Sequence, residues 1–129
     1  MENKNIKVLV TDDEDDFRHL MTFWLESKGY TVVAASGGEE AIRLIQAESP
    51  DIVFMDLRMP VMDGADTIKR IRGFNQDIPI ILISAYLDDA RVREATAYGI
   101  SGVFFKGKDF SQGLSLLNTV LRKHKQLKK

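Results

Sequence analysis

The chain has 129 residues, 44% of them hydrophobic and 29% charged, a balance that argues against disorder and predicts a single domain over residues 1–129. Its lack of cysteine excludes disulfides, thiolate metal sites and cysteine nucleophiles, and its net charge of −1 provides no general attraction for nucleic acid. No signal-peptide pattern or apolar run of membrane-spanning length is present, so we expect a cytoplasmic protein that does not contact the membrane.

The first half of the chain predicts three strands and two helices. An apolar run at residues 6–10 predicts the first strand. The helix after it has one apolar face and ends at Gly29; that face is formed by Phe17, Leu20, Met21 and Trp24. Residues 30–34 predict a second strand, residues 41–45 lie in a second helix, and residues 51–55 predict a third strand.

The second half of the chain continues the alternation. A helix that carries Ile68 and Ile71 precedes a fourth strand at residues 79–83. A shorter helix over roughly residues 88–98 precedes a fifth strand at residues 103–105. The apolar face of the last helix is formed by Phe110, Leu114, Leu117 and Leu121. Five such units in succession predict an α/β fold, in which helices cover both faces of a parallel sheet.

Polar side chains follow the predicted strands, at the sheet edge where α/β folds bind ligands. They are Asp12, Asp13, Asp56, Ser84 and Lys106. Taken singly, each has an ordinary explanation as a helix cap or a polar strand end. Together they do not, because unit charges about 4 Å apart repel by about 4 kcal/mol at an effective dielectric constant near 20. Three carboxylates at one edge therefore indicate a counter-ion.

Oxygen ligands without Cys or His favour a hard divalent cation, Mg²⁺ or Mn²⁺. Mg²⁺ is usually bound by one or two carboxylates, waters and a phosphoryl oxygen, so the cluster predicts a phosphoryl site. Ser84 and Lys106 are placed to hold the remaining phosphoryl oxygens, since phosphoryl transfer depends mainly on positioning and charge neutralisation.

The order of these residues resembles that of the receiver domain of bacterial two-component response regulators. The resemblance covers essentially the whole chain and rests on VLVTDDE at residues 8–14, DLRMPVMDG at residues 56–64, Ser84-Ala85 and Lys106. It implies a flavodoxin-like, doubly wound (βα)5 fold with strand order 2-1-3-4-5. It also implies a phosphorelay signalling protein that catalyses only its own phosphorylation and dephosphorylation.

By this resemblance, Asp56 is the nucleophile that takes a phosphoryl group from a sensor histidine kinase or a histidine phosphotransfer protein, which gives an acyl phosphate. Asp12, Asp13, Asp56 and the backbone carbonyl of Arg58 are then the ligands of Mg²⁺. The resemblance further implies a switched surface that binds a downstream protein, with no direct binding of nucleic acid. A stand-alone regulator and the receiver of a longer protein both fit.

The resemblance also implies that Ser84 reorients toward the phosphoryl group and that Lys106 pairs with it. Two positions depart from the family pattern, and both bear on signal propagation. Gly107 stands where the family usually has Pro after a cis peptide, and Val103 stands where it often has Tyr or Phe. We expect a trans Lys106–Gly107 peptide, because a cis bond before a residue other than proline costs about 2.5–4 kcal/mol.

Arg58 and Tyr86 lie two residues beyond Asp56 and Ser84. The resemblance to receiver domains implies that these two residues flank the path of the water that hydrolyses the acyl phosphate, which must approach in line with the phosphorus. Arg58 then either reaches a phosphoryl oxygen or lies against the Tyr86 ring, which would prolong the phosphorylated state. The alternative is that both side chains point into solvent.

The sequence argues against three other functions. A phosphatase of the haloacid dehalogenase type needs a second aspartate two residues after its nucleophile, where this chain has Arg58. A flavodoxin-like FMN protein needs a phosphate loop after the first strand, where Asp12 and Asp13 would repel the phosphate. A degenerate receiver that only binds partners is disfavoured by the complete set of site residues, although Gly107 keeps it open.

Overall fold

The computed structural model describes residues 5–86 and 89–128, with side chains described as far as His124. Strands and helices alternate along the chain. The elements are β1 (Lys7–Thr11), α1 (Asp15–Ser27), β2 (Thr31–Ala35), α2 (Gly38–Glu48), β3 (Ile52–Asp56), α3 (Gly64–Arg72), β4 (Ile80–Ser84), α4 (Ala90–Tyr98), β5 (Gly102–Phe105) and α5 (Phe110–Lys128). The five strands form one parallel sheet in the order β2-β1-β3-β4-β5, which confirms the predicted flavodoxin-like α/β fold.

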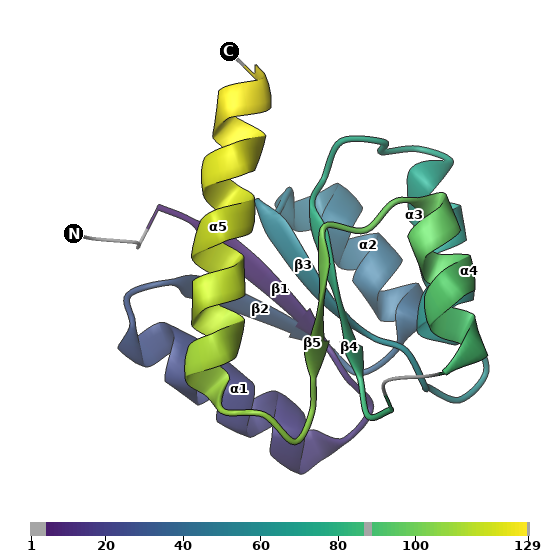
Figure 1. Cartoon of the computed structure of the whole chain (residues 1–129), viewed down its shortest axis with the longest axis horizontal. Coiled ribbons are helices and arrows are strands. Elements are labelled where there is room, and N and C mark those ends of the chain that lie inside the picture. Colours follow the sequence, from purple (N-terminus) through teal and green to yellow (C-terminus); the bar gives the residue numbers. More distant parts are fainter. Residues whose placement is uncertain (1–4, 87–88, 129) are drawn as a thin grey trace.

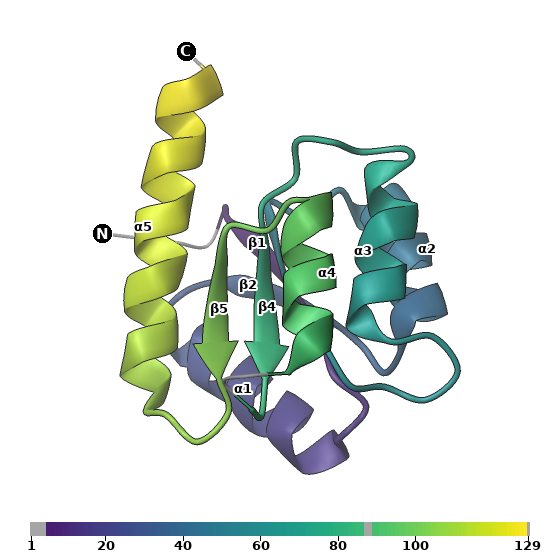
Figure 2. The same ribbon diagram turned by 45° about the vertical axis from the view of Figure 1, so that its right-hand side comes forward.

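The helices cover both faces of the sheet (Figures 1 and 2). One face packs against α1 and α5, and its buried residues include Val10, Phe54, Ile83, Met21 and Leu117. The other face packs against α2, α3 and α4, and its buried residues include Leu9, Met55, Leu82, Ile42 and Ile68. The side chains of successive strand residues point to opposite faces of the sheet, so a strand covered on both faces is apolar along its length.

The first four strands lie one residue further along the chain than predicted. The polar residues Asp56 and Ser84 are therefore the last residues of β3 and β4, and they pair with Ile83 and Phe105 respectively. Apolar periodicity reports only which side chains are buried, whereas backbone pairing continues through a polar residue. This pairing fixes the backbone of both residues at the sheet edge.

The prediction for the buried face of α1 is wrong at one position. Met21 and Leu25 are fully buried, and Phe17 and Trp24 are partly buried against Phe110, with ring centroids 5.8 and 5.5 Å from it. Leu20 is instead 56% exposed. The buried stripe follows the i, i+4 row from Phe17 through Met21 to Leu25, and Leu20 lies outside it.

The fourth and last helices agree with the predicted pattern. Asp89 is the N-cap of α4, and its side chain accepts a hydrogen bond from the backbone N–H of Arg91. The predicted start of this helix at Asp88 lies outside the described residues. Leu117 and Leu121 of α5 are buried, as the periodicity predicts.

In the described part of the chain, no helix is both long enough and apolar enough to cross a bilayer.

The loop between β3 and α3 contains a strained residue. Val61 has a φ of 71°, and the N–H of Met62 donates to the carbonyl of Pro60 at 2.8 Å, which closes a three-residue turn around it. A β-branched residue in this left-handed region costs about 1–3 kcal/mol. Because the Val61 side chain is fully exposed, replacing it loses no packing.

We therefore expect Val61→Gly to raise the free energy of unfolding by about 1 kcal/mol, once the greater entropy of glycine in the unfolded chain is deducted. Urea denaturation measures the change. Val61→Ala keeps a Cβ atom and is the matched control, with a smaller gain. A glycine variant no more stable than the parent would contradict the strain at Val61.

Candidate functional site

The carboxyl edge of the sheet brings together the residues that the sequence places at the strand ends. Asp12 directly follows β1, and Asp56 ends the neighbouring β3, whose Met55 pairs with Thr11. Carboxylate oxygens of Asp12, Asp13 and Asp56 lie within 4.8 Å of one another. The parallel register of β1 and β3 therefore produces the predicted acidic cluster.

Two carboxylates of this cluster lie inside the protein. Asp12 is 0% exposed and Asp56 is 3% exposed. Burial, followed by the negative charge of Asp12, raises the pKa of Asp56 to about 8, although the ammonium of Lys106 opposes the shift. Burial also raises the pKa of Asp12, although hydrogen bonds from Glu14 and Lys106 act against it. Without a further cation the pair thus retains a proton near neutral pH.

Lys106, which directly follows β5, is the cation of the site. Its Nζ lies 3.0 Å from Asp12 Oδ2 and 3.6 Å from Asp56 Oδ2, and 4.9 Å from the ring centroid of Phe17. It also donates a hydrogen bond to Glu14. Burial alone would lower the pKa of Lys106, but the hydrogen bonds to Glu14 and Asp12 outweigh it and raise the pKa to about 12.

Glu14 is a site residue that the sequence analysis missed. It belongs to the acidic run that follows β1, and the sequence pattern does not distinguish it from the other acidic residues of that run. Its hydrogen bond to Lys106 joins two residues 92 positions apart in the chain. Only the pairing of β1 and β5 with the rest of the sheet brings them together.

Ser84 is buried at the end of β4, and its hydroxyl is bonded to its own loop. Oγ donates to the carbonyl of Tyr86 at 2.8 Å and accepts from the N–H of Tyr86 at 3.3 Å. A reorientation toward Asp56 would exchange the first of these bonds for a new acceptor. The Lys106–Gly107 peptide is trans, as expected, since the described residues contain no cis peptide bond.

Two carboxylate oxygens of the cluster accept no hydrogen bond, which fits a bound divalent cation. Asp12 Oδ2 and Asp56 Oδ2 are buried without a hydrogen-bond partner, since the nearby Lys106 ammonium lacks hydrogen-bond geometry toward either atom. Buried carboxylate oxygens are normally satisfied, and these are the oxygen ligands that Mg²⁺ prefers. The three aspartates can therefore hold a metal ion.

Arg58 does not lie against the Tyr86 ring in this structure, which was one of the two arrangements predicted for it. The guanidinium of Arg58 donates two hydrogen bonds to Asp89, from Nε to Oδ2 at 2.8 Å and from Nη2 to Oδ1 at 2.6 Å. The side chain of Arg58 is 62% exposed, and Tyr86 is 68% exposed. The N-cap carboxylate of α4 outcompetes the ring because a bidentate ion pair is stronger than an exposed cation–π contact.

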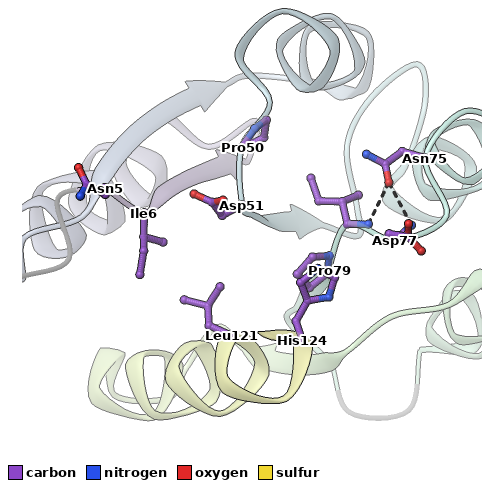
Figure 3. A pocket seen from close by; sticks show the side chains of 10 residues that line it. Asn5, Ile6, Pro50, Asp51, Asn75, Asp77, Pro79, Leu121 and His124 are labelled. Atoms are coloured by element: carbon purple, nitrogen blue, oxygen red, sulfur yellow. Dashed lines mark hydrogen bonds between the residues drawn. The ribbon is translucent and has the colours of Figure 1, made fainter. Parts of the chain in front are cut away.

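The opposite edge of the sheet contains a cavity of about 490 Å³ (Figure 3). It lies between the start of β1, β3 and β4 and the end of α5, where Leu121 and His124 face Ile6 and Pro79. At the rim of the cavity, the side-chain oxygen of Asn75 accepts hydrogen bonds from the backbone N–H groups of two nearby residues, both at 3.0 Å. No residue of the acidic cluster lines this cavity.

Comparison with known proteins agrees with this geometry. Residues 8–118 match the family described as response regulator receiver domain. Sporulation initiation phosphotransferase F of Bacillus subtilis is 30% identical over 108 residues, which cover 84% of this chain and 87% of that protein. The alkaline phosphatase synthesis transcriptional regulatory protein PhoP of B. subtilis is 38% identical over 81 residues, or 63% of this chain and 34% of that protein. The chain thus corresponds to about a third of the length of such regulators.

Two solved structures share the whole fold. The receiver domain of the Francisella response regulator 1452 has a TM-score of 0.83 at 28% identity, and the alignment covers 92% of this chain and 98% of that one. The chemotaxis response regulator CheY4 of Vibrio cholerae has a TM-score of 0.83 at 29% identity, with 89% and 98% covered. The sheet order, the acidic cluster at its carboxyl edge and the match over residues 8–118 show that the chain belongs to the response regulator receiver domain family, whose members are signalling modules rather than enzymes that turn over a separate substrate.

Proposed function

We propose that residues 1–129 form one receiver domain, located in the cytoplasm, that takes a phosphoryl group on Asp56 in a Mg²⁺-dependent reaction. The donor is a phosphohistidine on a sensor histidine kinase or a histidine phosphotransfer protein. The observation that carries the proposal is the buried pair Asp12 and Asp56, each with an Oδ2 that accepts no hydrogen bond, beside the ammonium of Lys106. The deciding experiment is labelling of Asp56 by a small phosphodonor, with and without metal.

In this reaction a carboxylate oxygen of Asp56 forms a bond to phosphorus. The bond from phosphorus to the donor's imidazole nitrogen breaks, and its electron pair stays on that nitrogen. Asp12, Asp13, Asp56 and the backbone carbonyl of Arg58 would hold Mg²⁺, which when bound supplies positive charge to the transferring phosphoryl group. The receiver itself contributes the nucleophile and the geometry, and the donor contributes the phosphoryl group.

Ser84 and Lys106 hold the product. The Lys106 ammonium, now shared among Glu14, Asp12 and Asp56, pairs with a phosphoryl oxygen. The Ser84 hydroxyl leaves the carbonyl of Tyr86 and donates to another phosphoryl oxygen. Because Ser84 ends β4 and its loop leads to α4, this movement biases a partner-binding surface formed by α4, β5 and α5.

The affinity for Mg²⁺ is expected to increase with pH. The pKa of Asp56 is raised to about 8 by burial and by Asp12, so below that pH the metal must displace a proton. The apparent dissociation constant should therefore fall by up to about tenfold per pH unit between about pH 6 and pH 8. Calorimetric titration at three pH values measures it, and Asp56→Asn should remove most of the dependence. A dissociation constant that does not change over this range would contradict the presence of a proton on the Asp12–Asp56 pair.

A further inference from the structure

Two arginines cross-link the start of α3 to the start of α4, beside the proposed phosphorylation site. Arg58, in the loop before α3, makes the bidentate ion pair with Asp89, the N-cap of α4. Arg91, in the first turn of α4, makes a bidentate pair with Asp63 through Nε and Nη2, both at 2.9 Å. Asp63 is in turn the N-cap of α3 and accepts the N–H of Asp66 at 2.9 Å. Each helix cap therefore binds an arginine from the opposite segment.

The two arginines are held unequally. Arg91 also pairs with Asp66 at 3.0 Å and with Glu94, and its side chain is 23% exposed. For Arg58, Asp89 is the acidic partner within the described residues, and the Arg58 side chain is 62% exposed. The Arg91 pair is therefore the fixed connection between the helices, and Arg58 is the arginine with freedom to change its partner.

We propose that Arg58 is a phosphoryl ligand that Asp89 binds in the unphosphorylated protein, and that its guanidinium moves to the phosphoryl group once Asp56 is phosphorylated. This inference rests on the proposed function. Arg58 lies two residues beyond Asp56, and its side chain is 62% exposed, so no packed neighbour prevents it from turning once it leaves Asp89. A phosphoryl group carries close to two negative charges and three acceptor oxygens, against one charge and two oxygens on a carboxylate, and guanidinium binds phosphate bidentately.

The exchange has two consequences. A guanidinium bound to the phosphoryl group obstructs the in-line approach of water, so the acyl phosphate lasts longer. The exchange also removes one of the two arginine connections at the start of α4 and leaves Asp89, whose side chain is 5% exposed, without its cation. The first turn of α4 then opens more often. Asp89 is thus a positioning residue that acts through Arg58.

The test uses Asp89→Asn, which keeps an N-cap side chain but removes the carboxylate that binds Arg58, since Asn and Asp cap helices equally well. Freed from Asp89, Arg58 should spend more time on the phosphoryl group and slow the Mg²⁺-dependent loss of phosphate by about two- to fivefold. Arg58→Gln should speed that loss by a similar factor while keeping its backbone carbonyl. The double variant should lose phosphate at the rate of Arg58→Gln alone, because Asp89 acts only through Arg58.

Asp63→Asn is the matched control, because it removes the carboxylate that binds Arg91 and likewise keeps a helix cap. Its phosphate should be lost within about twofold of the parent rate, the scatter expected for an exposed pair. The inference is overturned if Asp89→Asn changes the rate equally with and without Arg58. It is also overturned if Asp63→Asn reproduces the effect of Asp89→Asn.

Amide hydrogen exchange in the first turn of α4 provides a second readout. In the unphosphorylated chain, Arg58→Gln and Asp89→Asn should both speed this exchange, and beryllofluoride, as a phosphoryl mimic, should speed it in the parent but no further in Arg58→Gln. A parent chain that takes no phosphoryl group overturns the proposed function and this inference with it. A phosphorylated chain in which neither lifetime nor exchange depends on Arg58 overturns this inference alone.

Discussion

Incubation with acetyl phosphate or phosphoramidate and Mg²⁺ is expected to add one phosphoryl group to the chain, on Asp56. Asp56 is the carboxylate that ends the central strand β3, with Asp12 directly after the neighbouring strand β1 and Lys106 Nζ 3.6 Å from Asp56 Oδ2. The proposed attacking oxygen, the proposed metal ligands and the cation proposed to bind the product thus lie close together, which is the main requirement of phosphoryl transfer. Intact mass spectrometry detects the adduct.

Asp56→Asn and removal of the metal by a chelator are each expected to abolish the adduct. Asp77→Asn is the matched control, because Asp77 is an exposed aspartate that lines the cavity at the opposite edge of the sheet. Its labelling should equal that of the parent. An adduct of the same size on Asp56→Asn, or uptake that does not depend on metal, would refute the assignment of Asp56.

The metal-free protein is expected to lose stability as the pH rises from about 5 to 8. The pKa of Asp56 is about 8 in the folded chain, against an ordinary value of 3.8, so between these values the folded state holds a proton that the unfolded state has lost. Stability falls with pH wherever the folded state binds more protons. The loss should be at least about 1.4 kcal/mol, the free energy of one pKa unit.

Burial also raises the pKa of Asp12, which acts in the same direction, whereas Asp89 and Lys106 titrate outside this window. Hydrogen bonds from Arg58 lower the pKa of Asp89, so its contribution is lost only as the pH falls below the ordinary range of a carboxyl. The pKa of Lys106 is raised to about 12, so its contribution is lost only in strong base. Urea denaturation at several pH values in a chelating buffer measures the effect. Asp56→Asn should flatten the profile and be more stable than the parent at pH 8, and Mg²⁺ should restore stability to the parent there.

If the free energy of unfolding of the parent rises between pH 5 and pH 8, the folded protein does not hold a proton on the Asp12–Asp56 pair. A profile that falls equally in Asp56→Asn would place the responsible group elsewhere. Because unfolding needs no phosphodonor, this experiment tests the electrostatics of the acidic cluster separately from its chemistry.

The order of the elements and the composition of the site could be predicted from the sequence alone. Continuous apolar runs separated by helical periodicity indicate buried parallel strands, since each strand is covered on both faces. Parallel strands all end at one edge, so the polar residues that follow them must meet there. This argument, together with the family resemblance, predicts that five polar residues meet at one edge, and the structure has them there: Asp12, Asp13, Asp56, Ser84 and Lys106.

Contacts between elements were decided only by the tertiary structure. The ion pairs of Arg58 with Asp89 and of Arg91 with Asp63 join residues 31 and 28 positions apart. Periodicity reports the environment of one element and carries no information about which charged ends of two elements meet. The exposure of Leu20 has the same origin, because the width of the buried stripe on α1 depends on the angle at which the helix crosses the sheet. The sequence therefore determined which polar groups gather at the carboxyl edge of the sheet, and the packing of the helices decided which charged groups pair around them.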